Sequence, residues 1–182
     1  LLKAHPVTIE VDLSKGLHAF NIVGLPDKAV EESRDRISAA IKNSGFKSPK
    51  AKNQKVVISL APANIKKEGP IYDLGMALAY LLSCEDIKFD PAGKIFLGEL
   101  SLDGELRPIT GTLPLIIEAK KSGFKDVYLP AQNAEEAALI KNINIYPSRT
   151  LNEIIDHLDP KSHITIKPQP RTIVETNTNI ID

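Results

Sequence analysis

Apolar and polar positions along the chain change from a strand-like to a helix-like spacing within the first 50 residues. Residues 7–13 (Val-Thr-Ile-Glu-Val-Asp-Leu) alternate strictly, which is typical of a half-buried β-strand. The turn residues at 14–16 and the apolar run at 20–23 then predict a β-hairpin. Helical spacing follows the sequence Gly-Leu-Pro-Asp at 24–27 and ends at Gly45, a left-handed cap. On this helix we expect Glu32 and Arg36 to pair on the solvent face.

Strands and helices alternate along the rest of the chain. Asp103-Gly104 between two apolar runs predicts a second hairpin, formed by residues 95–100 and 105–109. This order predicts an α/β fold built on a mixed sheet. We expect further strands at 55–60, 127–129 and 143–146, and helices at 70–82, 114–122, 135–140 and 151–158.

The periodic pattern ends at residue 158, which divides the chain into a domain at 1–158 and a tail at 159–182. Pro160, Pro168 and Pro170 alternate with polar residues in the tail, a composition typical of a flexible linker. A linker at this end implies another domain beyond it. The chain also begins with leucine, so we expect it to be part of a longer protein.

Composition narrows the class of protein. With 182 residues and 23 charges of each sign, the chain fits one ordinary domain and lacks the charge of a strongly basic nucleic-acid module. The single cysteine, Cys84, excludes an intramolecular disulfide, which suits a cytoplasmic protein, and we expect it to be a buried, inert thiol. No apolar stretch approaches the length of a membrane span, and no signal peptide is present, so no membrane association is expected.

Common catalytic and cofactor motifs are missing. The sequence lacks the phosphate-binding pattern G-x-x-x-x-G-K-[ST], and its four scattered histidines have no partner at metal-ligand spacing. We therefore expect no cofactor and no metal. The pattern S-x-x-K, which can mark a Ser–Lys nucleophile pair, occurs at Ser44–Lys47 and Ser122–Lys125. In both places it follows a helix with Gly and Phe in the cap positions, so we interpret it as a helix ending.

Two segments are candidates for binding anions. A run of lysines without an acidic neighbour could contact nucleic-acid phosphates, although a solvated loop is the simpler interpretation. The loop Lys66-Lys67-Glu68-Gly69-Pro70 enters a helix and could hold an anion through its amides, with Lys66, Lys67 and Gly69 as the candidate residues. The alternative is that Pro70 and Asp73 simply start the helix. The run of lysines that could contact phosphates consists of Lys42, Lys47, Lys50, Lys52 and Lys55.

Several segments together resemble the bacterial magnesium-chelatase-like AAA+ family, which includes the competence protein ComM and YifB. Each segment alone is a weak signal, but the match extends over residues 7–158. The segments are Asn21-Ile22-Val23-Gly24-Leu25-Pro26-Asp27, Ala29-Val30, Glu32-Ser33, Arg36, Asn43-Ser44-Gly45-Phe46, Leu60-Ala61-Pro62-Ala63, Lys67-Glu68-Gly69-Pro70, Tyr72-Asp73-Leu74, residues 96–108, Leu129-Pro130-Ala131, Asn133-Ala134 and Glu136-Ala137-Ala138-Leu139.

The resemblance implies an N-terminal domain with the mixed α/β fold of the Lon proteolytic domain, in the ribosomal-protein-type domain 2-like class. It also implies that an ATPase motor with bound ATP and Mg²⁺ follows, with its phosphate loop beyond Asp182. The tail would connect the domain to that motor, and a first strand of such domains could lie upstream of Leu1.

Comparison with Lon implies that the domain is not an enzyme. The serine nucleophile of Lon lies in K-D-G-P-S, which corresponds here to Lys67-Glu68-Gly69-Pro70-Ile71. The lysine base lies in P-I-G-G-L-K, which places Leu113 at the position of the base. Neither Ile71 nor Leu113 can act as nucleophile or base, so we expect no peptidase activity.

Three functions remain open. The first is a non-catalytic domain of a ComM-like hexameric motor that drives branch migration of DNA in natural transformation, where the domain helps to assemble the ring or to guide DNA. The second is a pure oligomerisation or partner-docking scaffold. The third, which has the least support, is a residual peptidase or a chelatase subunit.

Overall fold

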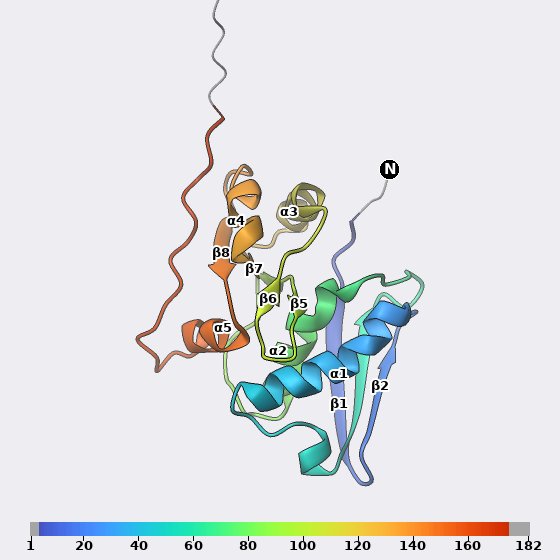
Figure 1. The fold of residues 1–182 in the computed structure, drawn as a ribbon. Helices are drawn as coiled ribbons and strands as arrows, with labels where there is room; N and C mark the ends of the chain where they lie inside the picture. Colours follow the sequence, from blue (N-terminus) through green and yellow to red (C-terminus); the bar gives the residue numbers. More distant parts are fainter. Residues whose placement is uncertain (1–3, 175–182) are drawn as a thin grey trace, which may run out of the picture.

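The computed structural model describes residues 4–174, which form a mixed α/β fold as the sequence predicted. The described strands form two three-stranded sheets and a two-stranded ribbon, and helices pack against them (Figure 1). The strands are β1 (Thr8–Lys15), β2 (Ala19–Val23), β3 (Gln54–Ala61), β4 (Lys94–Phe96), β5 (Glu99–Leu100), β6 (Leu106–Arg107), β7 (Asp126–Pro130) and β8 (Asn144–Ser148).

Five α-helices and two short 3₁₀ turns complete the described part of the chain. The helix predicted at 70–82 begins as a 3₁₀ turn and continues as α2, and the helix predicted at 151–158 is found with those bounds. The helix predicted at 135–140 starts earlier, directly after β7. The elements are α1 (Lys28–Asn43), η1 (Lys50–Lys52), η2 (Pro70–Tyr72), α2 (Asp73–Ser83), α3 (Thr112–Lys121), α4 (Ala131–Ala137) and α5 (Leu151–Leu158).

The predicted hairpin between the first two strands is wrong, because β3 lies between them. The sheet order is β1-β3-β2, with β1 antiparallel and β2 parallel to β3. Val56, Ile58 and Leu60 on β3 are fully buried, whereas β1 and β2 alternate between half-buried and exposed positions. The most deeply buried strand therefore takes the centre, and the strands with more exposed positions take the edges.

The second sheet is parallel throughout, in the order β4-β7-β8. This arrangement changes the second predicted hairpin. Only its inner part forms, as the short antiparallel ribbon of β5 and β6. Residues 95 and 96, expected to belong to the same hairpin strand, instead lie in β4, which pairs with β7. Gly98, at φ +158°, lies between the two and donates its N–H to Ile71 O at 3.0 Å.

Both S-x-x-K segments are helix endings, as interpreted from the sequence. Phe46 N–H donates to Ile41 O at 3.1 Å after α1, and Phe124 N–H donates to Ala119 O at 3.1 Å after α3. These are the long-range bonds of a Schellman ending, and the glycines that precede the two phenylalanines have positive φ. The serines therefore end helices and have no nucleophilic geometry with the lysines.

The buried side chains form two clusters. The larger lies between α1, α2 and the first sheet and extends to α5, and the smaller lies between α3, α4 and the second sheet. Four aromatic rings pack together within the larger cluster: Phe96 stacks on Tyr128 and Tyr128 on Tyr146, with centroids 5.1 and 4.7 Å apart. Phe89 meets Phe96 edge-on.

Residues 163–172, which we call the strap, lie in the segment that the sequence predicted to be a linker. They form no helix or strand, yet Ile166 is buried and belongs to the larger core cluster. The backbone of the strap also bonds to β8 and to the end of α4. The strap therefore packs against the domain, which corrects the prediction of a flexible linker for these residues. The remainder of the tail, residues 175–182, lies outside the described residues.

Candidate functional site

Two loops that carry family-like motifs lie directly against each other. The first is residues 24–27, before α1, and the second is residues 66–69, before η2. Lys67 N–H donates to Leu25 O at 3.0 Å, and Asp27 N–H donates to Lys67 O at 2.9 Å. Gly69 N–H donates to the Asp27 side chain at 3.0 Å, and the other carboxylate oxygen of Asp27 caps α1 at Val30 N–H. Asp27 therefore joins the two loops and starts the helix.

Lys67 lies inside this loop pair. Its side chain is fully buried, and its ammonium donates to Gly24 O at 2.8 Å and to Pro62 O. Burial lowers the pKa of Lys67. The prediction that Lys67 could hold an external anion is wrong, because its donors already point at internal carbonyl groups.

The other two candidate anion ligands do not form an open site either. The Gly69 N–H is bonded to Asp27, so a carboxylate of the chain itself occupies the place that an anion would take. Lys66 is exposed, and its ammonium lies 3.7 Å from Glu68, a weak surface pair. The geometry of this loop supports the alternative interpretation, in which Pro70 and Asp73 start the helix.

A buried polar network joins α1 to α2 and to the β5–β6 ribbon. Asp73 is fully buried at the start of α2 and accepts from Ser33 Oγ at 2.5 Å, from Arg36 Nε at 2.7 Å and from Leu100 N–H at 3.1 Å. Arg36 also donates to Ala29 O and to Ser33 Oγ, both at 2.9 Å. The network is fully satisfied, as a buried carboxylate requires.

This network corrects the expected pairing of Arg36 with Glu32 on the solvent face. Arg36 turns towards Asp73, and its side chain is only 18% exposed. The hydrogen bond to Asp73 raises the pKa of Arg36. Sequence reasoning missed the network, although Asp73 at the start of an apolar helix was a usable signal: an acid flanked by residues that must be buried needs a partner.

The positions that correspond to the nucleophile and base of Lon lie on different elements. Ile71 is in η2, is half-buried and packs against the smaller core cluster. Leu113 is half-buried in the first turn of α3. Ile71 lines a cavity, described next, whereas Leu113 is not among its lining residues.

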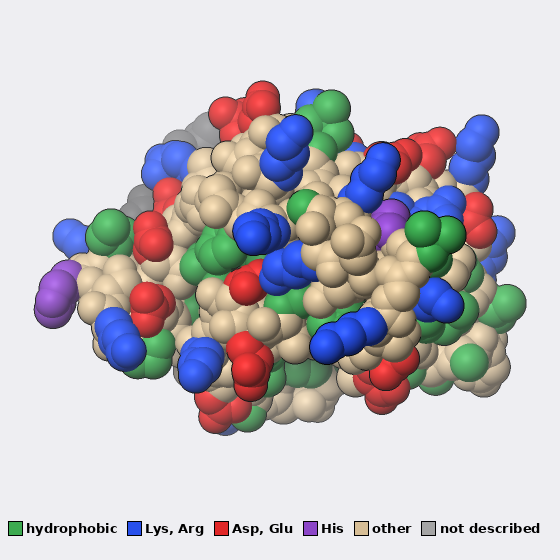
Figure 2. Space-filling model, turned by 90° about the horizontal axis from the view of Figure 1, so that it is seen from below, with side chains coloured by type: hydrophobic (Ala, Val, Ile, Leu, Met, Phe, Trp, Pro, Cys, Tyr) green, Lys and Arg blue, Asp and Glu red, His purple; other side chains and the backbone are tan. Residues whose placement is uncertain are grey.

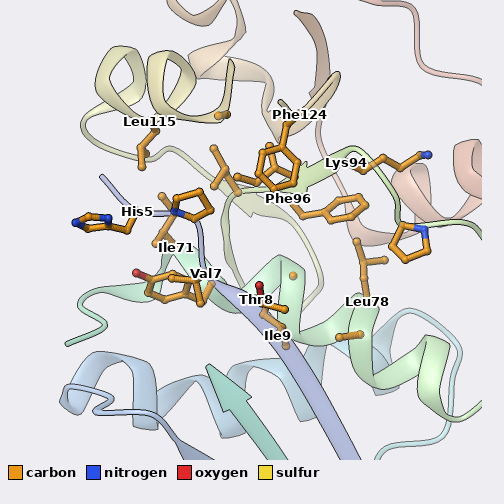
Figure 3. Close-up of a pocket in the computed structure, with 18 of the residues that line it drawn as sticks. His5, Val7, Thr8, Ile9, Ile71, Leu78, Lys94, Phe96, Leu115 and Phe124 are labelled. Carbon is orange, nitrogen blue, oxygen red and sulfur yellow. The ribbon is translucent and has the colours of Figure 1, made fainter. Parts of the chain in front are cut away.

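The cavity has a volume of about 360 Å³ and lies between the N-terminal end of β1, α2, β4 and α3. Figure 3 shows mostly apolar side chains around it, among them Val7, Ile71, Phe96 and Phe124. His5 and Lys94 lie on opposite sides of this view. Such a lining offers mainly shape and apolar contact.

The lysine run gathers at one end of the molecule. Its members come from the end of α1, the following loop, η1 and the start of β3. Lys42, Lys47, Lys50 and Lys55 are exposed, whereas Lys52 pairs with Asp86 at 2.6 Å. Figure 2 views the molecule from below, the side on which this end lies in Figure 1, and basic side chains are interspersed there with acidic ones.

Two further polar residues, Asn133 and Cys84, make contacts within the domain. Asn133 on α4 is buried, and its amide accepts from Ile109 N–H and donates to Ile109 O, both at 2.9 Å. It thereby holds the chain that leads into α3. Cys84 is half-buried, not fully buried as expected, with its sulfur 3.9 Å from Gln54. Sequence reasoning gave no signal for the role of Asn133.

Comparisons with known proteins place these motifs in a family. The family model described as subunit ChlI of Mg-chelatase matches residues 9–133, more than half of the chain. The chain is 36% identical over 166 residues to the competence protein ComM of Haemophilus influenzae, covering 91% of this chain and 32% of ComM. The chain belongs to the magnesium-chelatase-like family of ComM and YifB.

Other members and more distant relatives agree with this assignment. The chain is 38% identical over 174 residues to YifB of Escherichia coli, covering 95% of this chain and 33% of YifB. It thus spans about a third of the length of these curated relatives. Lon protease 2 of Bacillus subtilis is 28% identical over 167 residues, or 84% of this chain and 29% of Lon, which fits the mixed α/β fold. The DNA repair protein RadA of Streptococcus pneumoniae is 33% identical over 91 residues, 50% of this chain and 21% of RadA.

Two general findings concern the described residues alone. Within residues 4–174, no helix has both the length and the apolar character needed to cross a membrane. In the same part of the chain, no three His, Cys, Asp or Glu side chains gather in a way that could hold a metal ion.

Proposed function

We propose that this chain is a non-catalytic domain of a cytoplasmic, ComM-like AAA+ ATPase that acts on DNA, and that its lysine-bearing end helps to guide the DNA. The observation that carries the proposal is that Lys42, Lys47, Lys50 and Lys55 are all exposed along the segment from the end of α1 to the start of β3, which lies at one end of the molecule (Figure 1). The relative RadA, a DNA repair protein, supports a role with DNA.

The proposal assigns no chemistry to the domain itself. Ile71 and Leu113, at the positions of nucleophile and base in Lon, carry no group that could attack or take a proton. The chain also lacks a phosphate loop, so its own residues do not fit ATP and Mg²⁺. Those ligands belong, in this proposal, to an ATPase domain of the whole protein that assembles as a hexamer. Casein and short fluorogenic peptides should therefore remain uncleaved by the pure domain.

Fluorescence anisotropy with labelled single-stranded and branched DNA tests the role of the lysines. Substitution of Lys42, Lys47, Lys50 and Lys55 by glutamine should weaken binding. It should also flatten the salt dependence on single strands by a slope of about 3, since each phosphate contact contributes about 0.7.

The matched control is a variant with four other exposed lysines replaced by glutamine. Its net charge changes by the same amount, but binding should be retained if the location of the lysines matters. No binding by the unmodified domain at low salt, or equal losses in both variants, would refute DNA guidance by this end. The control lysines are Lys120, Lys121, Lys125 and Lys141.

A second candidate is an oligomerisation or docking scaffold. Strand β2 forms one edge of its sheet, and two apolar side chains, Val23 and Leu25, are 45% and 54% exposed in and beside it. Gel filtration with light scattering separates the two functions. A monomer that binds DNA supports guidance, whereas an oligomer without DNA affinity supports the scaffold.

A further inference from the structure

The strap crosses three elements of the domain and bonds to each of them. Ile166 N–H donates to His157 Nδ1 on α5 at 2.8 Å, and Gln169 N–H donates to Ile145 O on β8 at 2.7 Å. Thr172 N–H and Oγ1 donate to Ala138 O at 3.0 Å and to Glu135 O at 2.6 Å, at the end of α4. The strap therefore contacts α5, then the edge of the second sheet, then α4.

The strap covers an edge that would otherwise be open. Strand β8 is the last strand of its sheet and pairs with β7 on one side only. Figure 1 shows the strap, in red-orange, leaving α5 and continuing on the side of β8 and α4. Its anchor is Ile166, which is only 8% exposed and packs in the larger core cluster. Exposed residues occupy most other strap positions.

The anchor is held by a bond that depends on the protonation state of one histidine. The ring of His157 lies against Tyr146 and Tyr128, with centroids 5.0 and 5.6 Å apart. Nδ1 accepts from Ile166 N–H only if it carries no proton, so the neutral ring must hold its proton on Nε2. A doubly protonated ring would place an N–H against the N–H of Ile166.

We propose that the strap is a pH-sensitive latch: protonation of His157 removes the acceptor for Ile166 N–H and releases residues 163–172 from α5, β8 and α4. Release would expose the edge of the second sheet. It would also free residues 163–172 from their contacts with the domain. This inference goes beyond the proposed function and does not depend on DNA binding.

Charged groups around His157 set the sign of the effect. Burial lowers the pKa of His157, and Lys94 on β4 lowers it further, whereas Asp126 on β7 opposes the shift. The hydroxyls of Tyr128 and Tyr146 have raised pKa values and stay neutral. Other titratable groups nearby in the sequence are Glu153 and Asp156 on α5, and His163 and Lys167 in the strap.

Because the docked state lowers the pKa of His157, it binds fewer protons than the released state. Docking is therefore at full strength above the ordinary histidine pKa of about 6.5. It weakens progressively as the pH falls from there towards the lowered value. Below the lowered value, no further weakening from this group is expected.

NMR titration of the ¹⁵N-labelled chain from pH 7.5 to 5.0 tests the latch. The amide signals of Ile166, Gln169 and Thr172 should shift together along the titration curve of His157. Their hydrogen exchange, corrected for its intrinsic pH dependence, should accelerate about tenfold, a change of about 1.4 kcal/mol. Strap signals that do not respond when His157 titrates would overturn the proposal.

Three variants separate the latch from general effects of pH. Replacement His157→Asn keeps an acceptor near the position of Nδ1 without a titrating ring, so the strap should stay docked down to pH 5.0. Replacement Ile166→Ala should release the strap at every pH while α5 stays folded. Replacement His163→Gln, which removes the exposed histidine of the strap, should leave the transition unchanged. A transition that persists in His157→Asn, or disappears in His163→Gln, would refute the latch.

Discussion

The buried pair of Arg36 and Asp73 offers the sharpest test of how this domain is held together. Replacement Arg36→Met removes the guanidinium and keeps much of the apolar bulk. Asp73, which is fully buried, would then retain only Ser33 Oγ and Leu100 N–H as donors. A carboxylate in that position is short of compensating charge and must stay ionised at a cost or take up a proton.

The magnitude follows from burial. Breaking a fully buried ion pair by removing one partner costs about 3–5 kcal/mol. The side chain of Arg36 is 18% exposed, so water can reach part of the vacated space, and we expect about 2–3 kcal/mol instead. For a domain of this size, that loss corresponds to a decrease in Tm of about 4–12 °C.

A double-mutant cycle shows whether the loss belongs to the pair. Replacement Asp73→Asn places an amide N–H₂ against donors that now meet a carboxylate, and should also cost about 2–3 kcal/mol. The loss of stability in the double variant should be smaller than the sum of the two single losses by at least about 1 kcal/mol, because the interaction can be lost only once. Urea unfolding followed by far-UV circular dichroism measures the free energy of unfolding of the unmodified chain, both single variants and the double variant. The method suits a chain without tryptophan.

The control is Glu32→Gln on the exposed face of the same helix. If Arg36 paired with Glu32, as the spacing of four suggested, this change would remove the partner of Arg36. The structure instead predicts a change below about 0.5 kcal/mol. Two results would contradict the network. One is a double-variant loss that equals the sum of the single losses to within about 0.5 kcal/mol. The other is a loss for Glu32→Gln equal to that for Arg36→Met.

Two further predictions concern the paired loops. Replacement Lys67→Met leaves two carbonyl groups without their buried donor and should cost about 2–4 kcal/mol in the free energy of unfolding, measured by the same urea unfolding. Lys66→Met at the exposed neighbour should change it by less than about 0.5 kcal/mol. A Cβ at Gly24 would lie 2.1 Å from Leu60 O, so Gly24→Ala should destabilise the domain by about 2 kcal/mol more than Gly45→Ala, which has positive φ but nothing within 4 Å; equal losses would show that backbone strain alone matters.

Local signals in the sequence predicted much of the secondary structure. The start of a helix after residues 24–27, its ending at Gly45 and the bounds of α5 depend on neighbouring residues, and all three are confirmed. The order of strands was not predictable in the same way. Whether β1 pairs with β2 or with β3 depends on which strand buries most apolar surface after the whole sheet has formed, and the turn at residues 14–16 carries no information about that.

The candidate site shows the same division between local and non-local information. The lysine run could be located because sequence neighbours remain near in space, and the structure brings its members to one end. The hydrogen-bond partners of Lys67 and Asp73 could not be found from the residues beside them. The partners of Lys67 lie 5 and 43 positions away, and those of Asp73 lie 27 to 40 positions away. Periodicity says nothing about such contacts.

The internal contacts also change the meaning of the family motifs themselves. Asp27, Arg36, Lys67 and Asp73 belong to the segments that carry the resemblance, and each spends its polar atoms on other parts of the same domain. These four residues therefore help to explain why the chain adopts this fold, because their polar atoms are bonded within the domain. Contacts with an external partner are then expected from side chains that the fold leaves exposed, which directs experiments to the exposed lysines and to the strap.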